Sequence, residues 1–430
     1  MPPSKPPPAA TPPSARTGWR DPLLHMLIAL ACAFALSQAF RTLGAMMATP
    51  LISAYGLSAR QLGLWSSAFH LGFGLLQITM GLSLDLYGVR RTVLCAFPMA
   101  VGGAALCAFA PGFGALVLGQ ALIGIGCAPA FLACTVFIAR HFAAERFTAM
   151  SGLAMSISGL GILFTGTPLA WLIEAFSWRA GYVALGGVAL LAWLAVYWRV
   201  REPAPPRPAQ DDATGGGARP SLRQALREML PLLRLPHTRG ILCFAAVSYA
   251  AFITLRGLWL GPMLHDRHAL SLVASGNVAL AMTLTGIVGP SLFGRLDPGR
   301  ARRPRWMAAC AGLGAALFAV MALTGHLWID IVLPVFYGLL SGYNVLQYAY
   351  VKSSYPAAVT GRAIALLNTA MFLGVALMQW LTGAVATWAA QQGIEPLRAA
   401  FLTVAAMLAA GALAFARMPQ ARTAPAMPAP

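Results

Sequence analysis

Twelve apolar stretches follow one another along this 430-residue chain, each about as long as a membrane crossing. Only 10% of the residues are charged, whereas a soluble protein of ordinary composition carries about 25%. A helix that crosses the hydrocarbon layer needs about 20 mostly apolar residues. The sequence therefore predicts an all-α membrane protein with twelve transmembrane helices, at residues 23–48, 60–84, 92–110, 113–138, 149–173, 181–198, 240–264, 271–293, 306–325, 328–351, 363–387 and 397–416.

The net charge of +18 could suggest a nucleic-acid partner, but the placement of the basic residues argues against one. Of the 30 Lys and Arg residues, 24 lie in the loops and tails on one side of the predicted helices. Only four, Arg60, Arg179, Arg267 and Arg398, lie in loops on the other side. Basic loops stay in the cytoplasm, so we expect both termini there, in a bacterial inner membrane.

The chain divides into two halves that carry similar motifs. We expect a disordered tail at 1–21, six-helix bundles at 22–198 and 240–417, a linker at 199–239 and a tail at 418–430. Within the linker, residues 221–234 fit either an interfacial helix or an extension of the seventh span. Asp85, Arg90 and Arg91 recur with the same internal spacing as Asp297, Arg302 and Arg303. Such an internal repeat is typical of secondary transporters.

Two arginines lie deep inside predicted spans, Arg41 in the first and Arg256 in the seventh. Ionisable residues at membrane depth are costly and mark functional sites. Because guanidinium groups bind carboxylate and phosphate in bidentate fashion, the pair predicts a site for an anion. The alternatives are that each side chain reaches to the interface or has a structural role.

The segment from Gly81 to Arg91, with Asp85, Gly88, Arg90 and Arg91 at set spacing, resembles the loop signature G-x-x-x-D-x-x-G-x-R-R of the major facilitator superfamily. It lies between predicted spans two and three, where that family has it. The resemblance implies two six-helix bundles that rock about a central site. It also implies that this loop and its second copy, Asp297, Arg302 and Arg303, act as a cytoplasmic latch between the bundles.

The resemblance further implies that the first and seventh helices face each other across the cavity, so that Arg41 and Arg256 would form an anion clamp. Two departures stand out. Gln120 occupies the place of the arginine in a motif that many proton-coupled members carry in span four. Gly166-Thr-Pro168 replaces the Gly-Pro motif that drug antiporters carry in span five.

Several polar residues of the spans are further candidates. Tyr337, Ser341, Asn344 and Tyr348 follow helical spacing in the tenth span, so they either line the path or join helices by hydrogen bonds. Trp259 and Tyr249 in the seventh span are weaker candidates. His70 in the second span could carry a proton, although a lone histidine in a bundle is more often a packing residue.

We interpret the chain as a secondary active transporter that moves a small anionic solute by proton symport or anion exchange. The alternatives are an efflux antiporter for drugs or amphipathic metabolites, and a transporter-like sensor without flux. No phosphate-binding loop, metal-type spacing or catalytic constellation is present in the sequence. We therefore expect no enzyme activity, no cofactor, no metal and a monomer.

Overall fold

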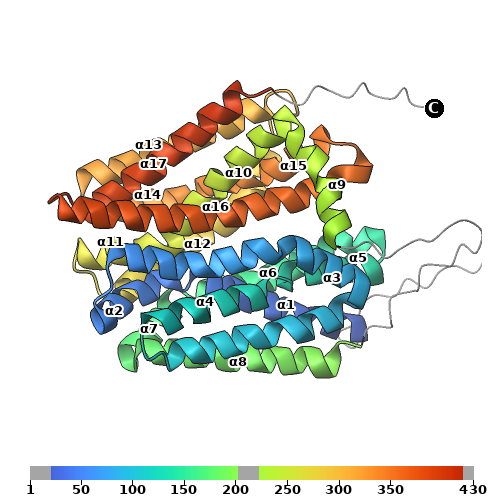
Figure 1. Ribbon diagram of the computed structural model, residues 1–430, viewed down its shortest axis with the longest axis horizontal. Coiled ribbons are helices and arrows are strands. Elements are labelled where there is room, and N and C mark those ends of the chain that lie inside the picture. The colour runs from blue at the N-terminus through green and yellow to red at the C-terminus, as the bar shows by residue number, and fades with distance from the viewer. Residues whose placement is uncertain (1–20, 202–221, 420–430) are drawn as a thin grey trace, which may run out of the picture.

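The computed structural model describes residues 21–201 and 222–419. The expected tails at 1–21 and 418–430 and the central part of the linker lie largely or wholly outside these residues. The described chain is helical throughout, and most of its helices run roughly along one direction (Figure 1).

The first half comprises α1 (Pro22–Thr42), α2 (Gly44–Tyr55), α3 (Ala59–Ala108), α4 (Phe113–Cys127), α5 (Ala130–His141), α6 (Ala144–Phe164), α7 (Thr167–Ala175) and α8 (Trp178–Arg199). The second half comprises α9 (Leu222–Arg234), α10 (Pro236–Thr254), the π-helical turn η1 (Leu255–Trp259), α11 (Leu260–Asp266), α12 (Leu272–Arg295), α13 (Arg303–Thr324), α14 (Leu327–Leu340), the 3₁₀ turn η2 (Ser341–Asn344), α15 (Val345–Ser354), α16 (Ala357–Gln391) and α17 (Pro396–Arg417).

Within the described residues, eleven helical stretches are long and apolar enough to cross a membrane. One of them, α3, has 50 residues and would be about 75 Å long if straight. That length is more than twice the hydrocarbon thickness of about 30 Å. Gly88, with φ of 81°, kinks α3 in its middle, so α3 holds two crossings. The expected all-α membrane architecture is confirmed, and the crossings number twelve.

Several crossings are broken rather than continuous, which the sequence did not indicate. The first runs from Pro22 to Tyr55, longer than the predicted 23–48, and changes from α1 to α2 at Leu43. The tenth is interrupted by the 3₁₀ turn η2. The linker helix α9 is separate from α10, because Leu235 between them is extended. It is therefore not a continuation of the seventh span.

The two halves meet along α3 and α16, which lie side by side between them (Figure 1). At one end, where α2, α7 and α11 lie, the halves touch closely, and we call this the closed end. Here the Thr167 hydroxyl donates to the Asn277 side chain at 2.6 Å, and the Arg60 amide donates to Thr387 Oγ1 at 2.7 Å. A Cβ on Gly44 would overlap the Gly257 carbonyl oxygen. The halves are thus held together at this end.

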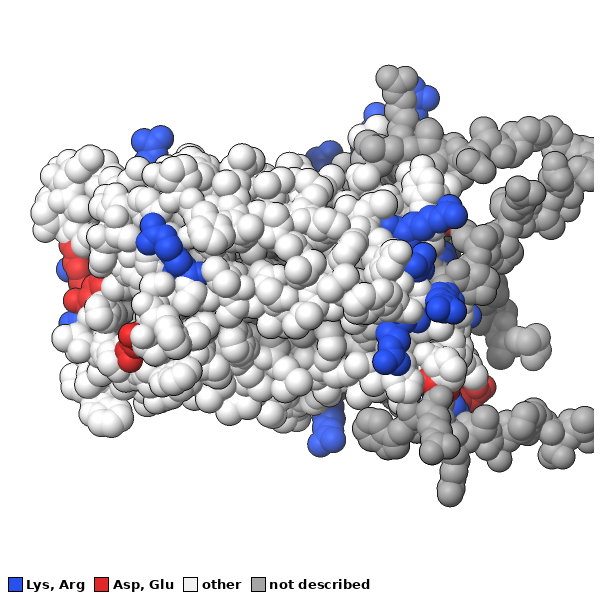
Figure 2. Space-filling model, turned by 90° about the horizontal axis from the view of Figure 1, so that it is seen from below, with Lys and Arg blue, Asp and Glu red and all other residues white. Residues whose placement is uncertain are grey.

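We call the opposite end, which carries α5 and α9, the linker end. Figure 2 shows one face of the molecule. Most of the Lys and Arg residues visible in this view gather near the linker end, with an uncharged band between the two ends. A band without charge is what a lipid-facing surface requires, because charged side chains are costly in hydrocarbon.

Candidate functional site

Arg41 lies in the last turn of α1, directly before the break at Leu43. Its guanidinium donates to the Tyr249 hydroxyl of α10 at 3.1 Å. The same group lies 4.9 Å from the ring centre of Phe73 and 4.7 Å from that of Phe372. With 8% of its surface exposed, Arg41 is buried. None of these partners is charged, so these contacts leave the positive charge without a counter-ion.

The two phenyl rings form a platform under the guanidinium. Phe73 comes from α3 and Phe372 from α16, one from each half, and their ring centres are 4.3 Å apart. The three distances make a nearly equilateral triangle, so both rings lie on the same side of the guanidinium. Cation–π contacts of this kind can stabilise a desolvated charge by about 2 kcal/mol. They leave the other edges of Arg41 available to a ligand.

A cavity of about 320 Å³ lies between the halves at this point. None of the described residues that line it is acidic; they are Phe34, Gln38, Arg41, Phe73, Gln77, Phe131, Met155, Tyr249, Pro290, Asn344, Val345, Tyr348, Asn368, Met371 and Phe372. The structure thus brings Arg41 together with two other predicted site residues, Asn344 and Tyr348, and with the weaker candidate Tyr249.

Arg256 lies beyond the cavity, toward the closed end, and does not line it. It sits in the π-helical turn η1 and is wholly buried. Its Nε donates to Thr283 Oγ1 of α12 at 3.0 Å. Its other nitrogens reach across to the first half, where they donate to the carbonyl oxygens of Thr42 at 3.4 Å and Ile162 at 3.3 Å, and to Thr165 Oγ1 at 3.3 Å.

The backbones that carry the two arginines cross closely. A Cβ on Gly257 would lie 3.2 Å from the Arg41 carbonyl oxygen. From there the Arg41 side chain points into the cavity. The Arg256 side chain points into the contact between the two halves at the closed end, which we call the closed seam. A clamp formed by Arg41 and Arg256 together therefore stays a prediction, because it requires a conformation in which Arg256 has left its present partners.

Three further predicted residues lie away from the cavity. Tyr337 is buried in the second half, with its ring 5.1 Å from that of Phe318. The Trp259 indole donates to Thr382 Oγ1 at 3.0 Å. His70 is buried on α3, and its Nδ1 lies 3.3 Å from the Ser66 carbonyl oxygen.

The tenth crossing explains why only part of its predicted face lines the cavity. The turn η2, from Ser341 to Asn344, winds more tightly than an α-helix, with about 3.0 rather than 3.6 residues per turn. It therefore rotates the face that follows it relative to the face before it. Asn344 and Tyr348 line the cavity, whereas Tyr337 packs inside the second half.

Sequence reasoning missed several lining residues. Gln38 precedes Arg41 by three positions, which places both on one face of α1. Gln77 and Asn368 are amides within otherwise apolar spans, a signal that could have found them. Phe73 and Phe372 gave no signal, because phenylalanine is common throughout such helices and only the packing of α3 on α16 brings these two together.

The contacts described for the predicted latch residues stay within each half. Asp85 accepts from Arg140 of α5 at 3.2 Å, and Arg90 donates to the Tyr197 carbonyl oxygen of α8 at 3.0 Å. Asp297 accepts two bonds from Arg303, at 3.1 and 2.5 Å. These bonds lower the pKa of the Asp297 carboxyl below its ordinary value. A latch that joins the halves stays a prediction.

Gln120, the departure in span four, packs inside the first half. Its amide donates to the Tyr182 hydroxyl at 2.8 Å, and both residues are buried. This position therefore stabilises the contact between α4 and α8 and lies outside the cavity lining.

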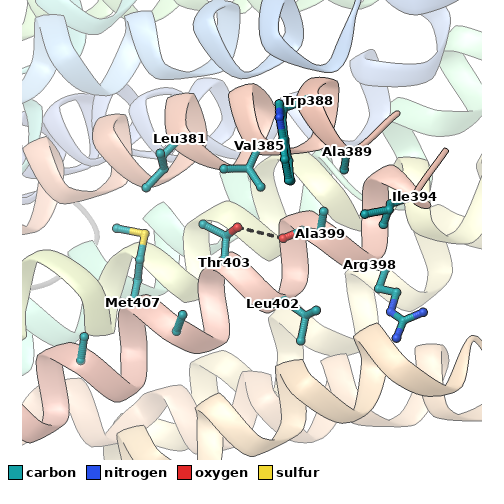
Figure 3. Close-up of a pocket in the computed structure, with 12 residues that line it drawn as sticks. Leu381, Val385, Trp388, Ala389, Ile394, Arg398, Ala399, Leu402, Thr403 and Met407 are labelled. Carbon is teal, nitrogen blue, oxygen red and sulfur yellow. Dashed lines mark hydrogen bonds between the residues drawn. The ribbon is translucent and has the colours of Figure 1, made fainter. Parts of the chain in front are cut away.

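A larger hollow, of about 840 Å³, lies between α16 and α17. Figure 3 shows Leu381, Val385 and Trp388 of α16 facing Leu402 and Met407 of α17, with Arg398 at one end. Its lining comes from these two helices and the loop between them, so it is separate from the cavity between the halves.

Among the described residues, no three His, Cys, Asp or Glu side chains gather as a metal site.

The fold and the cavity between two helical halves define an integral membrane protein with twelve crossings. A profile of the Major Facilitator Superfamily matches residues 29–379, and the chain belongs to that family of secondary transporters. It is not an enzyme. The crystal structure of the nucleoside transporter NupG superimposes with a TM-score of 0.73 at 13% identity, covering 92% of this chain and 99% of that one. At this identity the likeness concerns the fold alone.

Two relatives are similar in sequence. A protein of Cupriavidus necator described as a probable sulfoacetate transporter, SauU, is 26% identical over 312 residues, which are 70% of this chain and 72% of that protein. The hexuronate transporter of Bacillus subtilis is 25% identical over 240 residues, which are 54% of this chain and 54% of that protein.

Proposed function

We propose that this protein carries a small organic anion across the membrane by alternating access, and that Arg41 binds the anion. The observation that supports this most is the cavity between the halves, in which Arg41 is the only charged residue among the described residues of the lining. A charge held at membrane depth costs at least about 2.5 kcal/mol. A bound anion offsets that cost, whereas a cation would add to it.

The relatives support an anionic substrate. Sulfoacetate and hexuronate, after which the two similar transporters are described, both carry acidic groups. The chain keeps an intramembrane arginine at position 41 although its span-four arginine is replaced by Gln120. Among the described residues that line the cavity, Arg41 is the one with a charge.

We propose that the closed end faces outward and that the linker end faces the cytoplasm of a bacterial cell. The placement of 24 of 30 basic residues on the linker side supports this orientation. In that orientation the closed seam separates the cavity from the outside, so the conformation described is closed to the exterior. The opposite conformation requires the contacts of the closed end to separate.

Arg256 has a defined part in such a cycle. Its three bonds to Thr42, Ile162 and Thr165 join the second half to the first. Opening of the closed end breaks all three, while the bond to Thr283 within the second half can persist. We propose that Arg256 stabilises the contact between the halves at the closed end and loses its bonds to the first half when that end opens.

Coupling by proton symport or by anion exchange fits this site equally well. His70 is a candidate proton carrier because an imidazole can take up and release a proton, and it lies on α3, the helix that also carries Phe73 of the platform. Uptake of labelled substrate into proteoliposomes, driven by a pH gradient or by trapped unlabelled anion, separates the two modes. Replacement of His70 by Gln should abolish uptake driven by a pH gradient and leave uptake driven by trapped anion unchanged.

The test of the proposed function is binding, followed by flux. Purified protein is heated with carboxylates, sulfonates and phosphates, beside lipophilic cations. A ligand at 100 times its dissociation constant adds about 2.7 kcal/mol to stability. We expect an anion to stabilise the native protein and not Arg41→Gln. Arg398→Gln, which removes an exposed arginine of α17, is the matched control and should respond normally.

Stabilisation by lipophilic cations alone would contradict the proposal and favour efflux. Binding of an anion without flux in liposomes would make the protein a sensor. If Arg398→Gln loses the response as completely as Arg41→Gln, the effect is one of net charge and Arg41 is not the binding residue.

A further inference from the structure

Resting on the proposed function, we infer that the substrate is a monocarboxylate with a largely apolar body, rather than a dicarboxylate or a polyhydroxylated sugar acid. Three features of the cavity carry this inference: its single positive charge, the engagement of its polar side chains, and its apolar walls. The inference separates this chain from the substrates after which the two relatives are described.

The charge of the cavity matches one negative group. Within residues 21–201 and 222–419, Arg41 is the only lining residue with a charge, and one guanidinium binds one carboxylate in bidentate geometry. The other intramembrane arginine, Arg256, is wholly buried and donates to four acceptors outside the cavity. A second negative group on the ligand would be enclosed without a counter-charge, which is strongly unfavourable.

Most polar side chains of the lining already have partners within the protein. Asn344 donates to the Ser341 carbonyl oxygen at 2.8 Å and accepts from Gln347 at 2.6 Å. The Tyr348 hydroxyl donates to Asn368 at 2.7 Å. Gln77 donates to the Ala128 carbonyl oxygen at 3.2 Å.

Few polar atoms therefore remain for a ligand. Besides Arg41, they include the amide of Gln38, the hydrogen of the Tyr249 hydroxyl, and the free atoms of Gln77, Asn344 and Asn368. These atoms can satisfy about three ligand hydroxyl groups, since each hydroxyl offers one donor and needs one acceptor or donor in the wall. A sugar acid with five hydroxyls would leave some of them buried without partners, and each such group weakens binding.

The walls of the cavity suit an apolar body. The apolar members of the lining outnumber the polar ones and include the rings of Phe34, Phe73, Phe131 and Phe372. The volume of about 320 Å³ is at the small end of the range of about 300–1,000 Å³ for small-molecule sites. A short aliphatic chain or a single aromatic ring fills such a space without exposing it to water.

Two matched pairs of ligands test the inference by calorimetry on the full-length protein. Phenylacetate and phenylmalonate share a ring and differ by one carboxylate. Hexanoate and gluconate share six carbons and differ by five hydroxyls. We expect phenylacetate to bind at least about 100-fold more tightly than phenylmalonate, which corresponds to about 2.8 kcal/mol. We expect hexanoate to bind at least about 10-fold more tightly than gluconate, which corresponds to about 1.4 kcal/mol.

Two controls show that binding uses the carboxylate. Phenylacetamide, which is neutral, should not bind, and Arg41→Gln should not bind phenylacetate. A lining variant then tests the walls: Met155→Gln adds an amide of similar size at a half-exposed position. This variant should reduce the ratio between the dissociation constants of gluconate and hexanoate several-fold.

The outcomes separate the inference from the proposed function. If phenylmalonate or gluconate binds as tightly as its partner, through Arg41, the inference is wrong while the anion site stands. If none of the four acids binds but a sulfonate or a phosphate stabilises the protein through Arg41, the inference is wrong while the anion site stands. If no anion of any class stabilises the protein, the anion site is wrong as well. If phenylacetamide binds as well as phenylacetate, apolar contact alone explains the binding, and both are wrong.

Discussion

Removing the guanidinium of Arg256 should open the closed end of the protein. The side chain is wholly buried and joins the second half to the first through three hydrogen bonds. Replacement by Met keeps a long, unbranched side chain but removes all of these donors. The conformation with a closed seam should lose stability relative to the conformation with an open one.

The bonds set the size of the effect. At 3.3–3.4 Å they are long for N–H···O bonds, so each contributes less than a well-formed bond to a charged group. Taking somewhat under 1 kcal/mol for each gives about 2 kcal/mol in all. An equilibrium between closed and open seams then shifts about 30-fold toward the open form.

Electron spin resonance can measure the seam directly. Spin labels on Arg60→Cys at the start of α3 and Gln392→Cys at the end of α16 report the separation of the halves at the closed end, with native cysteines replaced. Arg256→Met should raise the population of long distances. Thr165→Val removes one of the three acceptors in the first half. It should therefore shift the free energy between the closed and open forms by roughly a third as much as Arg256→Met does.

Thr283→Val is the matched control, because Thr283 lies in the same half as Arg256. It should leave the distances unchanged. The reasoning is refuted if Arg256→Met does not lengthen them, or if Thr283→Val lengthens them equally.

Three further predictions concern single contacts. Gly44→Val should also populate the open seam in the same measurement, because its side chain would overlap a carbonyl of η1; an unchanged seam would show that the crossing adjusts. Gln120→Leu should lower stability by about 1 kcal/mol in thermal unfolding, since it removes the amide that donates to the buried Tyr182 hydroxyl, while ligand affinity stays unchanged; a selective loss of affinity would contradict this. Because Arg303 lowers the pKa of Asp297, their bonds stabilise the fold above the ordinary aspartate pKa of about 3.9, and this stability is lost as pH falls below it. Asp297→Asn should cost up to about 1 kcal/mol at pH 7 and nothing at low pH, as thermal unfolding at the two pH values can show; an equal loss at both would show that charge is not involved.

Most of the membrane architecture could be predicted from the sequence because the physical constraint is strong. A backbone in hydrocarbon must satisfy its own hydrogen bonds, so each long apolar stretch is a helix. The breaks were not predictable from composition. Leu43 and the π-helical turn around Arg256 carry no glycine or proline pattern that differs from the rest of the chain, and the packing of the halves determines them.

The candidate site was predicted in part. Arg41 stood out because a charge in an apolar span is rare, and Asn344 and Tyr348 stood out by helical spacing. The same spacing also selected Tyr337, which packs inside the second half, because the turn η2 rotates one part of the tenth crossing relative to the other. Spacing alone assumes a regular helix.

By itself, the sequence determined that the chain crosses a membrane in two similar halves and that each half carries one deep arginine, because burial of charge and length of apolar stretches are local properties. Only the tertiary structure decided that the two arginines have different surroundings. Arg41 lies on phenyl rings from both halves and faces a cavity, whereas Arg256 is enclosed by carbonyl and hydroxyl oxygens of the seam. The reason is that these partners come from segments far apart in the chain, which only the packing of the halves brings together.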